Sequence, residues 1–353
     1  MDASMERILE LVREPVFLVS EGQVCWRNRS AKGLLLHNDP ISRYLEDGGN
    51  LYSLWNREGT LHVPLIMDNA CYEASVQATM EGDLFVTTRQ KEEETEGASI
   101  AMQAAISLRR PLMALRSVAE EMYAELDSPQ ALHLGSEMNR ALYQLRRLSD
   151  QMFDGGRLLM HRKQAQRIPT DLRAFALELL TQLRPIIEMD GWKLETVLPH
   201  ESLRGAVDRD LLEQALLNLL SNALLHTRRG GKVRVELQRH GQFILFHVDD
   251  NGEGMAQNSE LSEDRSMDPR RGLGFGLQMV REIARLHGGS LTVMGKGPAG
   301  GVRASFSIVP ESTVLEMKTP RFSVSREAIG ERTLVALSDA LSSEMFNTDD
   351  IQA

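Results

Sequence analysis

Asn218 and Asn222 are the first residues whose types and spacing suit chemistry. They stand four apart in a helical pattern, so both carboxamides project from one face and can reach a common ion or phosphate. Amide oxygens are ligands that suit Mg²⁺. Taken alone, the pair also fits two asparagines that cap a helix or face solvent.

A second candidate site is the run Val248–Met255, VDDNGEGM, in which a strand ends in acidic residues. The carboxylate of Asp250 can accept a hydrogen bond from an exocyclic amine such as that of adenine. Gly252 and Gly254 allow the backbone to approach such a base closely. A lone run of this kind is also common in ordinary turns.

A third candidate site is the run GLGFGL, which leads directly into a helix expected over Gln278–His287. It contains Gly272, Gly274, Gly276 and Leu277. Free backbone N–H groups and the positive end of the helix meet there, which favours a phosphate. A Rossmann interpretation fails, because no strand immediately precedes Gly272 and the βαβ repeat is absent.

In this order and spacing, the three elements resemble the N, G1 and G2 boxes of the GHKL ATPase and kinase superfamily, from Asp171 to Pro310. The runs NLLSNALLHT, VDDNGEGM and GLGFGLQMVREIARLHGG are most similar to those of sensor histidine kinases. The resemblance implies ATP and Mg²⁺ as ligands. By it, Asn222 coordinates Mg²⁺, Asn218 supports the phosphates and Asp250 binds adenine. The pocket and its lid are then shaped by Gly252, Gly254, Gly272, Gly274 and Gly276, with Leu277 following.

One difference within the superfamily and two departures from the kinase pattern bear on activity. ATP-hydrolysing members have Glu where Asn218 stands, and an amide cannot take the proton of an attacking water, so hydrolysis is disfavoured as the main reaction. Leu225 stands where the family often has Lys. The stretch Ala256–Arg271 lacks the usual phenylalanine-containing box. Its three arginines either replace the lysine or belong to a solvated loop.

The phosphoacceptor box of the family is also altered. Pro111 fixes the register, which places Ile106 at the histidine position and Ser107 at the acid position. Isoleucine cannot act as a nucleophile. His133 and His161 are interpreted as ordinary surface or interface residues. One hypothesis is therefore a pseudokinase that regulates signalling through its nucleotide; the alternative is an active histidine kinase that uses another histidine, in this chain or in a partner.

Two long helices must position that box. Apolar residues alternate in steps of four and three along Ala101–Met122 and again along Leu134–Met152. The break at Asp127-Ser128-Pro129 makes these helices a hairpin, and Gly155-Gly156 is expected to loosen or end the second helix. Because a hairpin cannot enclose its own seam, we expect a homodimer with a four-helix bundle.

The expected fold class is α+β and multidomain. Residues 1–90 are predicted to form a PAS-like α/β sensor, since Ile8–Ala31 resembles a PAS domain, and residues 91–165 the antiparallel helical hairpin. Residues 166–310 are the α/β-sandwich ATP domain. Residues 311–353 are a C-terminal extension with an amphipathic helix that covers the hairpin or the ATP domain. Its apolar side carries Leu334, Leu337, Leu341 and Met345.

Composition excludes several other classes of function. The net charge of −10 and the absence of a basic block disfavour nucleic acid and anionic lipid. Two cysteines are too few for a disulfide framework or a thiolate zinc site. No apolar run approaches the ~20 residues that span a bilayer, so no membrane insertion and a cytoplasmic location are expected. The partner, beyond a second copy, could be a response-regulator receiver domain.

Overall fold

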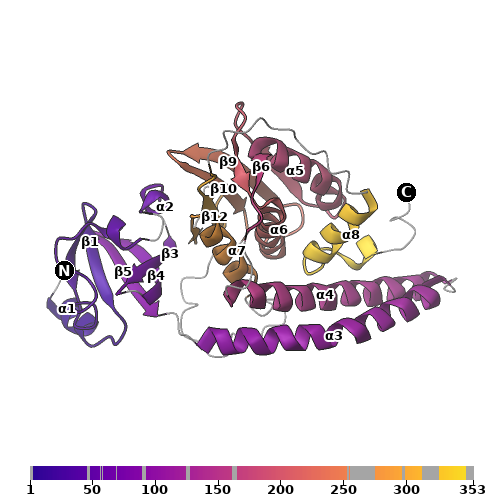
Figure 1. Cartoon of the computed structure of the whole chain (residues 1–353), viewed down its shortest axis with the longest axis horizontal. Helices are drawn as coiled ribbons and strands as arrows, with labels where there is room; N and C mark the ends of the chain where they lie inside the picture. Colours follow the sequence, from indigo (N-terminus) through magenta and orange to yellow (C-terminus); the bar gives the residue numbers. More distant parts are fainter. Residues whose placement is uncertain are drawn as a thin grey trace.

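The structure is a computed structural model. It describes residues 3–45, 48–55, 57, 59–68, 70–89, 93–124, 128–160, 165–252, 254, 275–295, 299–311 and 326–346. Along the chain lie an N-terminal sheet, two long helices, an α/β domain and a C-terminal segment that returns to the long helices (Figure 1). None of the helices in these ranges combines the length and apolar character needed to cross a membrane.

The N-terminal region is an antiparallel sheet with short helices. Its strands are β1 (Val16–Ser20), β2 (Gln23–Arg27), β3 (Thr60–Met67), β4 (Ala70–Thr79) and β5 (Gly82–Arg89), in the order β2-β1-β5-β4-β3. Its helices are α1 (Ala3–Glu10), the 3₁₀ turn η1 (Ile41–Arg43) and α2 (Asn50–Ser53). Strands are predicted from the sequence over residues 16–19, 23–26, 61–67, 72–79 and 84–88, and all five are present. Phe17 and Phe85 stack in the core with ring centroids 4.8 Å apart.

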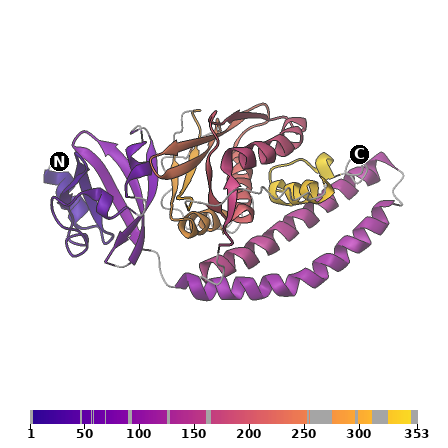
Figure 2. The same cartoon turned by 45° about the horizontal axis from the view of Figure 1, so that its top comes forward.

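Two long helices follow and lie side by side in both views (Figures 1 and 2). They are α3 (Glu93–Ala124) and α4 (Pro129–Leu159). Ser128 caps α4 by accepting from the Ala131 N–H at 3.2 Å. The expectation that Gly155-Gly156 ends α4 is wrong, because the helix continues to Leu159 with both glycines buried. Packing of α4 against the ATP domain offsets the helix cost of glycine, ~1 kcal/mol each.

The apolar seam of these helices is only partly filled within one chain. Ala105 and Ala119 are buried at 0% and 3% exposure. By contrast, Leu115 and Met122 are both 54% exposed, and Leu145 on α4 is 46% exposed. One hairpin therefore leaves an apolar stripe on its surface.

The C-terminal half is a mixed α/β layer structure. Its main strands are β7 (Lys193–Val197), β9 (Lys232–His240), β10 (Phe243–Asp250), β11 (Leu291–Met294) and β12 (Arg303–Ile308), in the order β11-β12-β10-β9-β7. Helices α5 (Leu172–Met189), α6 (Arg209–His226) and α7 (Phe275–Leu286) pack against them around one apolar core. A small second sheet pairs β6 (Ile168–Asp171) with β8 (Arg204–Val207), which the sequence did not predict.

The sheets of the N-terminal region and of the α/β domain join edge to edge. Strand β3 pairs antiparallel with β11, so ten strands form one sheet. The Gly295 N–H donates to the Thr60 carbonyl at 2.7 Å, and Arg281 pairs with Glu73 at 2.6 Å. The Arg281–Glu73 ion pair joins α7 to the N-terminal sheet.

The C-terminal segment consists of α8 (Arg326–Leu337) and the 3₁₀ turn η4 (Ser343–Phe346). It packs on both α4 and α6, as its apolar side predicts. Leu334, Leu337 and Leu341 are at most 5% exposed. The single helix expected through Met345 is wrong: the chain turns after Leu337, where the Ser342 N–H donates to Asp190 at 2.9 Å.

Candidate functional site

Helix α6 presents the two asparagines at one end of the α/β domain. Asn218 is 7% exposed, and its Nδ2 donates to the Gln214 carbonyl at 2.9 Å. Its Oδ1 accepts from Gln151 Nε2 at 3.1 Å. Asn222 is half-buried one turn later and makes no hydrogen bond or ion pair with the other described residues. Its amide oxygen is therefore available to a ligand.

Asp250 lies at the end of β10 and is 4% exposed. Its Oδ1 accepts two backbone N–H groups, from Gly252 at 2.8 Å and from Val302 at 3.2 Å. No hydrogen bond from the described residues reaches Oδ2. Burial raises the pKa of the Asp250 carboxyl, and the two N–H groups oppose that rise. The backbone thus holds one oxygen and leaves the other to receive a donor.

Glycines make the surroundings of Asp250 possible. A Cβ at Gly252 would lie 2.2 Å from the His226 carbonyl, and a Cβ at Gly301 would lie 2.1 Å from Asp250 Oδ1. Gly254 has φ +73°, which favours glycine. Gly301 was not singled out from the sequence. Its only signal is the run Gly297–Gly301, GPAGG, before β12.

The third motif is described only from residue 275 onward. Gly276 lies in the first turn of α7, where a Cβ would be 3.5 Å from Asn218 Oδ1. The start of α7, with its free N–H groups, therefore lies next to Asn218. Leu277 is 37% exposed. Gly272, Gly274, Arg265, Arg270 and Arg271 lie outside the described residues.

Helix α4 of the hairpin contacts α6 at and near Asn218. Gln151 of α4 touches Asn218, and Asp154, one turn on, accepts from Gln214 Nε2 at 3.3 Å. Neither α4 residue was predicted as part of the site. Both are polar residues of a long helix, and nothing in their spacing distinguishes them.

Ile106 occupies the position expected of the phosphoacceptor. Its neighbour Ala105 accepts a hydrogen bond from Ser149 Oγ at 3.2 Å, which places this turn of α3 two residues from the Gln151 contact. Ile106 is 51% exposed, so its position is accessible. Ser107 Oγ donates to the Gln103 carbonyl of its own helix at 3.0 Å.

Only one of the other two candidate histidines lies among the described residues. His133 is exposed on α4, 3.6 Å from Glu137. His161 lies outside the described residues.

Comparison with known proteins identifies the relatives of the chain. Residues 207–313 match the family described as histidine kinase-, DNA gyrase B- and HSP90-like ATPase. The alginate biosynthesis sensor protein KinB of Pseudomonas aeruginosa is 28% identical over 227 residues, which cover 61% of this chain and 37% of KinB. The histidine protein kinase DivJ of Caulobacter vibrioides is 29% identical over 220 residues, 58% of this chain and 36% of DivJ. The chain is a homologue of the sensor histidine kinases. The family that the three motifs indicate is thereby confirmed.

These matches are partial. The chain spans just over a third of the length of KinB and DivJ. Among solved structures, full-length ShkA in complex with AMPPNP matches with 18% identity and a TM-score of 0.49, covering 63% of this chain and 48% of ShkA. Histidine kinase ThkA in complex with the response regulator protein TrrA matches with 17% identity and a TM-score of 0.42, covering 86% of this chain and 98% of that chain.

Proposed function

We propose that this histidine kinase homologue binds Mg-ATP, does not phosphorylate its own hairpin, and acts as a signalling regulator whose conformation depends on the nucleotide. The observation that carries the proposal is Ile106. It is exposed on α3, close to the contact between Gln151 and Asn218, and it offers no nucleophile.

The proposed roles in nucleotide binding are supported by the contacts of each residue. Asp250 Oδ2 receives the adenine amine, since its other oxygen is held by the backbone. Asn222 supplies an amide oxygen to Mg²⁺, which proteins commonly hold together with the phosphates. The start of α7, with Gly272, Gly274 and Gly276 before and in its first turn, receives the phosphates.

The absence of phosphoryl transfer follows from chemistry. Transfer of a γ-phosphoryl group needs a nucleophile in line with the phosphate and a group that takes the nucleophile's proton. Ile106 provides no lone pair, and the Ser107 hydroxyl is not a carboxylate base. The phosphoacceptor box of this chain therefore lacks both parts.

The partner of the hairpin is a second copy of the chain. Leu115, Met122 and Leu145 form apolar surface that a four-helix bundle would bury. We further propose a response-regulator receiver domain as the downstream partner, on the strength of the family alone.

A labelling experiment tests the function. The purified chain is incubated with γ-labelled Mg-ATP and assayed for acid-labile, base-stable phosphate. We expect none in the parent chain, some in the double variant Ile106→His with Ser107→Glu, and less in Ile106→His alone. Ile100→His is the matched control, because Ile100 is also exposed on α3, at 63%.

The alternative function is an active kinase that uses a different histidine. It is favoured by the retention of Asp250 and Asn222 in an intact site. Labelling of the parent chain that disappears in His133→Ala or His161→Ala would establish that alternative and refute the regulator.

A further inference from the structure

The C-terminal segment, α8 and η4, lies between the long helices and the ATP domain and touches both (Figures 1 and 2). Nothing in the three ATP motifs requires such a segment. Its contacts therefore need an explanation of their own.

Charged contacts attach the segment to the hairpin. Glu331 of α8 pairs with Arg116 of α3 and, at 2.6 Å, with Arg146 of α4. Asp339 pairs with Arg147, whose side chain is only 8% exposed. Because Glu331 joins two helices and Asp339 neutralises a buried guanidinium, the segment is fixed to both arms of the hairpin.

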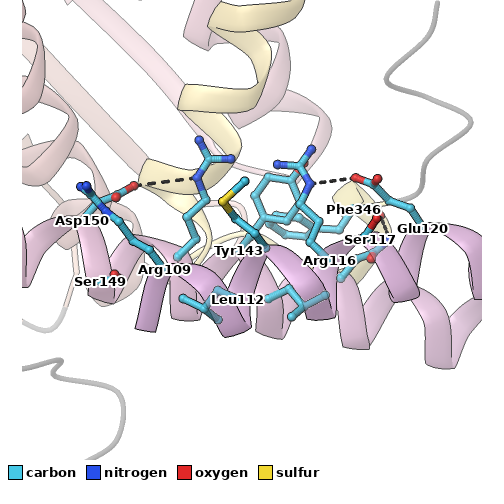
Figure 3. A pocket seen from close by; sticks show the side chains of 13 residues that line it. Arg109, Leu112, Arg116, Ser117, Glu120, Tyr143, Ser149, Asp150 and Phe346 are labelled. Carbon is cyan, nitrogen blue, oxygen red and sulfur yellow. Dashed lines mark hydrogen bonds and ion pairs between the residues drawn. The ribbon is translucent and has the colours of Figure 1, made fainter. Parts of the chain in front are cut away.

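Apolar contacts attach the same segment at both ends. Leu334 and Leu337 belong to the core of the ATP domain. Phe346 is 1% exposed and packs on Tyr143 of α4, with ring centroids 5.2 Å apart. Figure 3 shows these two rings with Arg116 beside them, at the edge of a cavity of about 570 Å³ over the hairpin. The segment thus links the ATP domain to α4.

Docking in this arrangement has a consequence for Asn218. The hairpin donor Gln151 occupies Asn218 Oδ1, and the neighbouring pair of Gln214 and Asp154 adds a second polar contact between α6 and α4. Asn218 is also the residue next to the start of α7. A nucleotide whose Mg²⁺ takes Asn218 Oδ1 as a ligand would therefore compete with Gln151 for that oxygen.

We propose that the C-terminal segment is an intramolecular clamp that holds the ATP domain on the hairpin with Gln151 on Asn218, so that docking and nucleotide binding compete. The proposal rests on the proposed function, since it takes Asn218 as part of the ATP site. Competition of this kind is reciprocal: if the clamp weakens ATP binding, ATP weakens the clamp by the same factor. The apparent affinity equals the intrinsic affinity multiplied by the fraction of chains that are undocked.

Two variants separate the clamp from the contact that it enforces. Glu331→Arg places a cation between Arg116 and Arg146 at a half-exposed site, which loosens the segment. Gln151→Ala removes the hairpin donor and leaves the segment untouched. Glu344→Arg is the matched control: it makes the same charge change in η4, where Glu344 is exposed and pairs with no other described residue.

Mg-ATP affinity is measured by calorimetry on the full chain. Loss of one hydrogen bond from the competing state should tighten binding about fivefold in Gln151→Ala. Loss of two half-exposed ion pairs should tighten binding about threefold or more in Glu331→Arg, with Glu344→Arg like the parent. A Kd unchanged in both test variants overturns the clamp and leaves the ATP site standing. No binding by any of these proteins overturns the ATP site and the clamp together.

Hydrogen exchange supplies the reciprocal measurement. Saturating Mg-ATP should speed amide exchange in residues 330–346 of the parent chain, because nucleotide favours the undocked arrangement. In Gln151→Ala the acceleration should be smaller. Exchange in these residues that is unchanged or slowed by Mg-ATP would contradict competition, even if the variants bind more tightly.

Discussion

Asp250→Asn is the most direct test of the proposed hydrogen bond between the adenine amine and Asp250 Oδ2. The asparagine keeps an oxygen at Oδ1, so the Gly252 and Val302 N–H groups retain their acceptor. At the other position it replaces an acceptor oxygen with an NH₂ donor. The adenine amine, itself a donor, would then face a donor.

The size of the effect follows from that mismatch. Leaving a buried polar group without a partner costs ~1–3 kcal/mol, which corresponds to a roughly 5- to 150-fold weaker Kd. Stability should change little, because the backbone contacts of Oδ1 persist. In Asp250→Ala, by contrast, two N–H groups lose their acceptor, and the free energy of unfolding should drop by at least ~1–3 kcal/mol as well.

Calorimetry with two nucleotides completes the test. ITP carries a carbonyl oxygen where ATP carries the amine, so Asp250→Asn should lose affinity for ATP while it gains affinity for ITP relative to the parent. Thermal unfolding of the same samples shows that the fold is intact. If the folded variant binds ATP as tightly as the parent, Asp250 does not contact the base and the assignment of the site is wrong.

Two further predictions concern assembly and pH. Leu115→Lys with Leu145→Lys should convert a dimer into monomers in light scattering, because both exposed side chains belong to the unfilled seam. A parent chain that is monomeric at tens of micromolar would contradict the bundle. Burial, with Arg303 nearby, lowers the pKa of His247 to about 3 from 6.5. Between these values the unfolded chain binds a proton that the folded chain does not, so stability is lost as pH falls, by roughly 2 kcal/mol from pH 6.5 to 5. Denaturant titrations of the parent and of His247→Gln should show that slope only in the parent, and equal slopes would refute it.

Local spacing was enough to predict most elements of the fold. The long helices α3 and α4 and the helix α7 each depend on residues a few positions apart in the chain. The same holds for the placement of Asp250 at a strand end and of Asn222 on a helix. The two wrong expectations, at Gly155-Gly156 and after Leu337, concern segments whose structure depends on packing against residues distant in the chain.

Contacts between regions could not be predicted in this way. Strand β3 meets β11 across more than two hundred residues of chain, and edge strands carry no sequence mark of the partner with which they pair. The contact of Gln151 with Asn218 spans 67 residues, and a glutamine on a long polar helix face looks like any solvated residue. The helical spacing of the C-terminal leucines predicted a docking surface on this chain, whereas the ion pairs of Glu331 became visible only in three dimensions.

The proposed nucleotide site and the contact from the hairpin meet at Asn218. The motif residues that we propose for nucleotide binding include Asp250, whose Oδ1 is held by two backbone N–H groups. The hairpin contributes Gln151 to the Asn218 amide, and on α3 the exposed Ile106, next to the buried seam residue Ala105, offers no nucleophile. In the proposed function, a nucleotide bound without a phosphoacceptor acts by changing whether the ATP domain is docked on the hairpin. The free energy that couples nucleotide binding to undocking is then about that of one hydrogen bond to the Asn218 amide oxygen, plus the contribution of the C-terminal segment.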